Sequence, residues 1–217
     1  KIMFKQLKLP FFGSKKQKAP NSSSEEYDPD EEARKSEIGS MWTRVKAVDR
    51  WKSNTVQIFD FDNGIEASPG WSTGGGDLMT YAFTKNEGRT PSPGTGPSAG
   101  VGGSGPYVYA ETSSPRVQGD LFTLTYDGSA CSNIGLGVSS VTFHYHMYGA
   151  TMGTLDVTNA AGEVVWSLGG DQGNSWQAAT VEVYSPSFAF EYMRGDGYQG
   201  DAAVALVSVK CGNGVQR

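Results

Sequence analysis

The chain has 217 residues, of which 37% are hydrophobic and 12% aromatic, so it can form one domain with an appendage but not a large multidomain enzyme. Its 29 glycines and 10 prolines are more than helical bundles carry, and they favour a loop-rich all-β fold. Residues 1–54 hold 12 Lys/Arg against 8 Asp/Glu, whereas residues 55–217 hold 6 against 15, and a body of net charge −9 argues against nucleic acid as a partner.

The first 20 residues combine lysines with apolar side chains in the sequence KIMFKQLKLPFFGSKKQKAP. Cationic and apolar segments favour anionic interfaces, so we expect residues 1–20 to bind a membrane surface or a partner, with a solvated tail as the alternative. Residues 21–32 are polar and acidic, which is typical of a linker. No stretch of the sequence approaches the roughly 18–20 consecutive apolar residues of a membrane-spanning helix.

A helix start signal follows this linker. Asp28 can cap a helix, Pro29 suits the first helical position, and Glu31 completes a capping box. Apolar residues then recur at three- and four-residue spacing, which predicts one amphipathic helix over about residues 29–51. We interpret its apolar stripe as a partner-docking surface, formed by Ile38, Met41, Trp42, Val45 and Val48. The predicted domain boundary therefore separates residues 1–54 from a β domain over residues 55–217.

From residue 55 the hydrophobic period switches to two. It predicts strands at 56–61, 107–111, 121–126, 141–148, 154–158, 164–168, 179–184, 188–193 and 203–210. The sequence from Asn159 to Gly162 indicates a hairpin turn. Short strands with no helices between them predict an all-β antiparallel sandwich or jelly roll of two sheets. The long Gly- and Pro-rich segment from Thr84 to Pro106 is expected to be a flexible binding loop or an inert coil.

Few side chains suggest chemistry. Cys131 and Cys211 are the only cysteines, and in a Gly-rich β domain they suggest one disulfide in an oxidising compartment, with two reduced, buried thiols as the alternative. His144 and His146 share one face of a strand, but zinc needs three or four ligands and the chain has no third histidine. The sequence contains neither a G-x-S-x-G elbow nor the lysine of a phosphate loop, so we do not expect an enzyme.

Several strings, in order, resemble the MAM domain, a module named after meprin, the A5 antigen and a receptor tyrosine phosphatase. They are FDFDNG at 59–64, Trp71, GRTPSPGTGPSAG at 88–100, YVYAETSSP at 107–115, FHYHMYGATMGTLDV at 143–157, VVWSLGGDQGNSWQ at 164–177 and YQGDAAVALVSVKCG at 198–212. The resemblance covers residues 56–212. It implies a two-sheet antiparallel jelly roll, used outside the cell for adhesion, oligomerisation or recognition and usually without catalysis.

The resemblance also implies two site features. Cys131 and Cys211 match one of the two cysteine pairs common in the family, whereas the first pair is missing here. Many members have a cation site made by an early acidic motif and by consecutive acidic residues near the end of the domain. Only Asp60, Asp62 and Asp201 match that set, because residues 202–205 are Ala-Ala-Val-Ala. A calcium or sodium ion is therefore expected only in a thinned site, and no other cofactor is expected.

These patterns together predict a non-catalytic recognition or adhesion module in the extracellular space or in an oxidising lumenal compartment, peripheral to a membrane. We expect protein partners, with residues 1–54 attaching the domain as a structural subunit to a larger or membrane-bound assembly. The alternative is a carbohydrate-binding jelly roll in which exposed aromatic side chains stack on sugars, the candidates being Trp71, Tyr107, Tyr109, Tyr148, Trp166, Trp176, Tyr184 and Tyr198.

Overall fold

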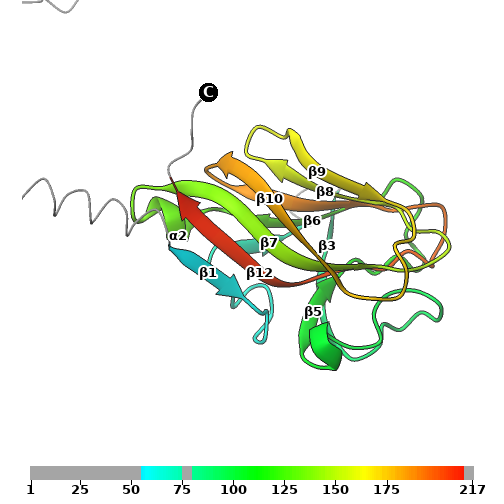
Figure 1. Ribbon diagram of the computed structural model, residues 1–217. Helices are drawn as coiled ribbons and strands as arrows, with labels where there is room; N and C mark the ends of the chain where they lie inside the picture. Colours follow the sequence, from blue (N-terminus) through cyan, green and yellow to red (C-terminus); the bar gives the residue numbers. More distant parts are fainter. Residues whose placement is uncertain (1–54, 75–79, 213–217) are drawn as a thin grey trace, which may run out of the picture. The chain divides into compact units, whose positions relative to one another are not determined.

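The computed structural model describes residues 55–74 and 80–212, drawn in colour in Figure 1. The predicted arm, linker and amphipathic helix, with the five partner-docking residues on that helix, lie outside the described residues. Within the described ranges no helix is long and apolar enough to cross a membrane.

The described residues form two β-sheets that pack face to face as a jelly-roll sandwich. The first sheet has the order β10 (Gln177–Ser185), β7 (Gly137–Met147), β12 (Ala202–Gly212), β5 (Pro106–Tyr109) and β4 (Thr84–Glu87), with β1 (Val56–Phe59) also on β12. The second has the order β2 (Trp71–Thr73), β6 (Leu121–Tyr126), β11 (Phe188–Met193), β8 (Thr154–Asn159) and β9 (Val164–Gly169), with β3 (Thr80–Ala82) also on β6. The strand pairs are antiparallel except β3 with β6, which is parallel.

In the middle of the first sheet, strand β12 has two partners along one edge. Its first half pairs with β5, through Ala203 and Val204, and its second half pairs with β1. Between the halves lies a β-bulge, where Leu206 has a φ of 48° in the left-handed region. The bulge changes the direction of the strand, which lets one long strand serve two short neighbours.

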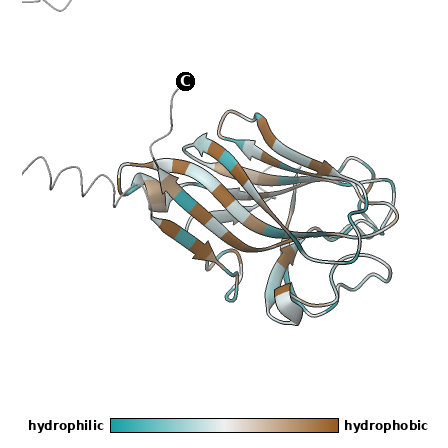
Figure 2. Ribbon diagram, viewed as in Figure 1, coloured by the Kyte–Doolittle hydropathy of each residue, from teal (hydrophilic) through white to brown (hydrophobic). Residues whose placement is uncertain are grey.

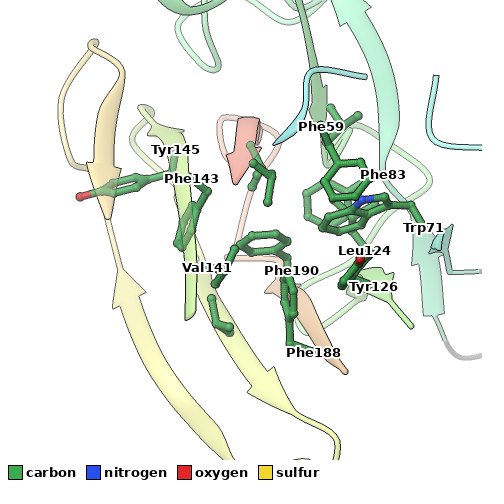
Figure 3. Close-up of a cluster of buried hydrophobic side chains, with 14 of the residues drawn as sticks. Phe59, Trp71, Phe83, Leu124, Tyr126, Val141, Phe143, Tyr145, Phe188 and Phe190 are labelled. Carbon is green, nitrogen blue, oxygen red and sulfur yellow. The ribbon is translucent and has the colours of Figure 1, made fainter. Parts of the chain in front are cut away.

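The core between the sheets is mainly aromatic. Hydrophobic and hydrophilic residues alternate along the strands, as the banding in Figure 2 shows, so one face of each strand points inward. Trp71 is buried with its ring centroid 5.1–6.2 Å from the rings of Phe59, Phe61, Tyr126, Phe188 and Phe190. Phe190 also lies against Phe143 of the opposite sheet at 4.8 Å, so aromatic contacts join the two sheets (Figure 3).

A second, smaller cluster lies on the outer face of the first sheet. Tyr107, Tyr109, Ala203 and Ala205 are buried there, although they point away from the main core. The side chains that cover them include Val101 from the Gly- and Pro-rich segment. Part of this segment, expected to be a flexible loop or an inert coil, thus covers one end of the sheet, and its first four residues form β4.

All nine predicted strands are confirmed, with shifts of a few residues at their ends. The first ends at Phe59 rather than Phe61, where the backbone turns with a φ of 61°. The turn at Asn159–Gly162 is confirmed between β8 and β9. Pattern analysis missed β2, β3 and β4, which have only three or four residues each, and the one-turn helix α2 (Ser129–Ser132).

Candidate functional site

Cys131 and Cys211 form a disulfide, which confirms the predicted pair. Their sulfur atoms are 2.02 Å apart and their Cα atoms 5.3 Å apart, and both residues are buried. Cys131 lies in α2, directly after β6, and Cys211 lies near the end of β12. The disulfide therefore links β12 of the first sheet to α2, which follows β6 of the second sheet. Disulfides form and persist in oxidising compartments, so the domain belongs in the extracellular space or in an oxidising lumen.

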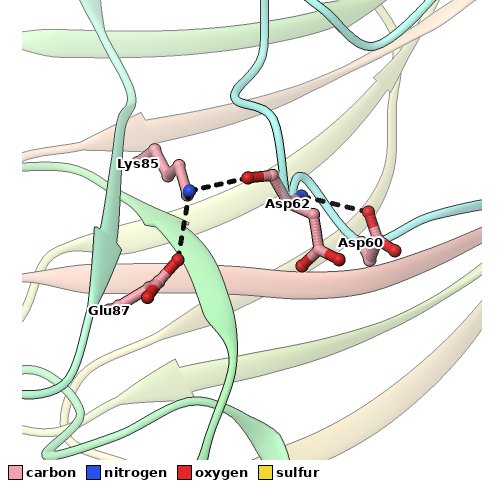
Figure 4. Close-up of polar contacts among 4 residues, drawn as sticks. All are labelled: Asp60, Asp62, Lys85 and Glu87. Carbon is pink, nitrogen blue, oxygen red and sulfur yellow. Dashed lines mark hydrogen bonds and ion pairs between the residues drawn. The ribbon is translucent and has the colours of Figure 1, made fainter.

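Asp60 and Asp62, two of the predicted cation ligands, lie in the exposed turn after β1 (Figure 4). The Oδ1 atom of Asp60 accepts a hydrogen bond of 3.0 Å from the backbone N–H of Asp62. The Nζ atom of Lys85 donates to the backbone carbonyl of Asp62 at 2.7 Å and forms an ion pair of 3.1 Å with Glu87. A lysine ammonium group therefore already provides positive charge at this turn.

Asp201, the third predicted ligand, is fully buried. Its Oδ1 atom accepts hydrogen bonds from the backbone N–H of Thr112, at 3.1 Å, and from the hydroxyl of Thr112, at 2.9 Å. Among the described residues its Oδ2 atom has no hydrogen-bond partner. Burial raises the pKa of Asp201 to about 6; the bonds from Thr112 oppose this rise, and repulsion from the carboxylate of Glu111 adds to it.

The three aspartates do not form a metal-binding cluster. In the two described ranges no group of three or more His, Cys, Asp or Glu side chains is placed to hold a metal ion. Carboxylate oxygens are the ligands that calcium takes, so each aspartate has suitable chemistry, but calcium needs six to eight oxygens around one point. The calcium or sodium site stays a prediction.

His146 has a structural environment on the outer face of β7. It is buried, and its Nε2–H donates to Oδ1 of Asn174 at 3.1 Å. Its ring lies 5.5 Å from that of Trp176 and 6.4 Å from that of Tyr148, both near edge-on. Burial lowers the pKa of His146, because it disfavours the charged imidazolium. The residue is therefore held neutral, inside an aromatic environment.

A hollow of about 190 Å³ opens beside His146, which we call the Trp176 hollow. It is lined by Pro97, Ser98, Ala99, Gly100, Gly103, His146, Asn174, Ser175 and Trp176. The indole N–H of Trp176 donates to the carbonyl of Ala99 at 2.8 Å, which ties the two walls together. The hollow therefore combines an aromatic ring with hydroxyl and amide groups and with no charged side chain.

A second hollow, of about 300 Å³, lies beside β1, and we call it the β1 hollow. It is lined by Gln57, Ile58, Phe59, Asp60, Asn63, Ala67, Ser68, Pro69 and Ala130. Ile58 is 72% exposed and Val56, on the same face of the strand, is 51% exposed. Two large apolar side chains therefore stand in solvent on this strand, one of them at the rim of the hollow.

Burial excludes two of the aromatic residues that were named as sugar platforms. Trp71 is the centre of the main core, and Tyr107 is fully buried beneath the Gly- and Pro-rich segment, so neither can stack on a sugar. Neither hollow was predicted. The walls of the Trp176 hollow come from residues 77 positions apart, at Ala99 and Trp176, and no short sequence pattern marks such a pairing. Trp176 was among the aromatic candidates, and the local signal for it is a tryptophan that follows an asparagine and a serine in the sequence.

Comparisons with known proteins place this fold in a family. The family model described as "MAM domain, meprin/A5/mu" matches residues 59–213. The chain belongs to the MAM domain family. This MAM domain is 38% identical, over 143 residues, to MAM domain-containing glycosylphosphatidylinositol anchor protein 1 of Gallus gallus, a match that covers 61% of the chain and 14% of that relative. The human protein of the same name is 40% identical over 143 residues, covering 60% and 14% of the two chains.

The chain thus spans about one seventh of the length of these curated relatives. Among solved structures, the MAM domain is similar to the K1 cleaved adhesin domain of Lys-gingipain from Porphyromonas gingivalis W83, with a TM-score of 0.50 and 17% identity. That match covers 72% of this chain and 98% of the adhesin domain. At such low identity the likeness shows a common fold.

Proposed function

We propose that this MAM domain is a non-catalytic recognition and adhesion module on the extracellular face of a membrane. Its family membership, the disulfide and the glycosylphosphatidylinositol anchors named in its relatives support this role. Residues 1–54 attach the domain, as a structural subunit, to a larger or membrane-bound assembly. The net positive charge of these residues and the apolar side chains among the first 20 suit such an attachment.

The surface that we propose for protein contact is β1 with the β1 hollow. Exposed apolar side chains beside a hollow are typical of interaction sites, because covering them removes apolar surface from water. Among the described residues β1 pairs with β12 alone, so the backbone of its other edge can accept an extended segment of a partner. The exposure of Ile58 is the observation that carries the proposal.

The environments of two buried ionisable side chains, His146 and Asp201, support a non-catalytic role. His146 is the one buried histidine of the described residues, and its ring is hydrogen-bonded to an asparagine and packed against aromatic rings, whereas a catalytic histidine is hydrogen-bonded to a nucleophile and a carboxylate. The buried carboxylate of Asp201 contacts threonine and backbone groups. We therefore assign binding, and no reaction, to the domain.

The test is binding of the labelled full chain to cells of the organism that produces it. Protein recognition predicts saturable binding that disappears after the cells are treated with trypsin and persists after treatment with glycosidases. The variant Ile58→Asp should weaken binding at least about tenfold, because it places a charge in the apolar contact. Val117→Asp is the matched control, since Val117 is 62% exposed on the segment between β5 and β6.

Both variants should unfold at the temperature of the unmodified chain, because neither side chain is buried. Binding that survives trypsin but not glycosidase would contradict protein recognition. Binding by Ile58→Asp equal to that of Val117→Asp would place the contact away from β1.

A further inference from the structure

The Trp176 hollow lies on the outer face of the first sheet, away from the core between the sheets. One wall is the segment from Pro97 to Gly103, and the other is the stretch from Asn174 to Trp176 that leads into β10. Its volume of about 190 Å³ is below the roughly 300 Å³ at which pockets for drug-sized ligands begin. A ligand of one small ring fits this size, and a longer chain would have to extend out of the mouth.

The indole of Trp176 is held in place without a ligand. Its N–H is bonded to the carbonyl of Ala99, and the rings of Tyr107 and His146 lie 5.7 Å and 5.5 Å from it, each steeply inclined to the indole plane. Because these contacts fix the ring, a ligand that packs against it does not need to order it. Such preorganisation increases affinity for a weakly bound ring.

The polar groups that line the hollow have hydrogen-bonding capacity that no described residue uses. Asn174 uses its Oδ1 atom for His146, so its Nδ2 group keeps two donors, and no hydrogen bond to another described residue uses them. Ser98 and Ser175 are exposed, and within the described ranges their hydroxyl groups have no hydrogen-bond partner. Three such groups around an aromatic ring match a ligand that has both hydroxyl groups and an apolar face.

The charge of the hollow favours a neutral ligand. None of its nine lining residues carries a charged side chain, and burial keeps His146 neutral. Asp171 is the acidic group that acts on His146 from nearby, and it would repel an anion. The hollow lacks the Arg or Lys that anionic sugars or phosphates need for binding.

We infer that the Trp176 hollow binds one neutral sugar ring at a time, with the indole of Trp176 packed against the ring and Asn174, Ser98 and Ser175 bonded to its hydroxyl groups. This site shares no lining residue with the β1 hollow. Sugar binding here is therefore independent of the proposed protein contact, and each can fail alone.

The experiment is an NMR titration of the full chain with the methyl glycosides of glucose, galactose, mannose and N-acetylglucosamine. The signals to follow are the indole N–H of Trp176 and the side-chain amide of Asn174. At least one neutral glycoside should shift both signals saturably, while the indole signals of Trp71, in the core, and of Trp166, partly buried against it, stay unchanged. Glucuronic acid and N-acetylneuraminic acid, as charged probes, should bind at least about tenfold more weakly.

Two variants locate the site. Ser175→Leu fills the mouth of the hollow and should abolish the shifts, whereas Ser167→Leu, the same change at an exposed position of β9, should leave them intact. Asn174→Asp keeps an acceptor for His146 but removes the amide donors, so it should weaken binding at least about tenfold. Unfolding curves of all three variants confirm that they are folded.

Three results would overturn the inference. The first is that no neutral glycoside shifts the two signals up to its solubility limit. The second is that Ser175→Leu binds as well as Ser167→Leu, which would place the sugar elsewhere. The third is that the acidic sugars bind more tightly than the neutral ones, which would contradict the neutral character of the site.

Discussion

Asp201 is a carboxylate in the interior of the protein with one oxygen satisfied by Thr112 and the other without a partner among the described residues. A buried charge of this kind is costly, and the protein lowers the cost by binding a proton, which is why the pKa rises to about 6. The folded state therefore binds this proton more tightly than the unfolded chain does. Stability from this group is fully present below about pH 4 and is lost as the pH rises to about 6.

We predict that Asp201→Asn gains stability relative to the unmodified domain as the pH rises from 4 to 7. A rise of the pKa from 3.8 to about 6 corresponds to roughly 3 kcal/mol at 1.36 kcal/mol per tenfold change in proton affinity. Urea unfolding at several pH values measures the difference in free energy of unfolding between the two proteins. Any cost of the new amide is independent of pH, so the change with pH isolates the carboxylate.

The contribution of His146 to stability changes with pH in the opposite direction and has to be separated from that of Asp201. Its pKa is lowered by burial, so its contribution to stability is present above about pH 6.5 and is lost as the pH falls. Because His146 is present in both proteins, its effect cancels in their difference. A difference that stays constant from pH 4 to 7 would show that the carboxylate of Asp201 is not shifted.

At the scale of single elements, β12 combines two partners, a bulge and one half of the disulfide. Leu206 at the bulge has a positive φ, which costs a residue with a side chain about 1–2 kcal/mol relative to glycine. Its side chain is 39% exposed, so partial burial offsets part of this cost. The strand keeps the conformation because its neighbours on both sides of the bulge are fixed by β5, β1 and β7.

We expect Leu206→Gly to change the free energy of unfolding by less than about 0.5 kcal/mol, because relief of the backbone strain offsets the entropy that glycine adds to the unfolded chain and the lost burial of the leucine side chain. Ser208→Gly is the matched control on the same strand. Its φ is not positive, so glycine there should lower stability by about 0.5–1 kcal/mol. Urea unfolding of both variants checks the prediction, which fails if both lose stability equally.

The disulfide between α2 and β12 closes a long loop of the chain. The two cysteines are 80 positions apart, and closing a loop of that length lowers the entropy of the unfolded chain by an amount equivalent to about 4.5 kcal/mol. The double variant Cys131→Ala, Cys211→Ala should lose about that much free energy of unfolding. Comparing its urea unfolding with that of the oxidised and the reduced domain measures the loss, and a loss below about 1 kcal/mol would show that the bond is dispensable for stability.

Local patterns predicted the strands well where they were long enough to alternate. The strands β6 and β11 were predicted with their observed bounds, because six residues give three inward and three outward positions. The three residues of β3 give no such pattern, and its parallel partner, β6, is about 40 positions away. The disulfide was predicted because no other cysteines compete. The burial of Asp201 was not, because the residues that cover it come from distant segments.

At the scale of the whole molecule, the described residues contain a closed core. The buried cluster of the described residues runs from Phe59 to Cys211. This arrangement bears on the predicted boundary between the arm and the β domain, which stays a prediction because the arm lies outside the described residues.

We predict that residues 55–217, produced alone in oxidising conditions, fold and unfold in a single cooperative transition, because they contain the whole described core and the disulfide. They should no longer associate with the membrane or the partner assembly that the full chain binds. Calorimetry measures the first expectation, and co-sedimentation with membranes of the producing cells measures the second. A truncated protein that does not fold would show that the predicted helix belongs to the core.

The two ends of the β domain lie side by side, since the backbone N–H of Cys211 donates to the carbonyl of Thr55 at 2.8 Å and Val56 pairs with Lys210. A pulling force applied at these ends would separate β1 from β12 by breaking their hydrogen bonds one after another, starting from the pair Val56 and Lys210. Once β1 was detached, the force would pass from β12 through the disulfide to Cys131. The residues between the two cysteines, which include β7 to β11 and most of β12, would carry no tension. Under mechanical load, the domain would thus give way in its first half, and the covalent bond would limit how far it can lengthen.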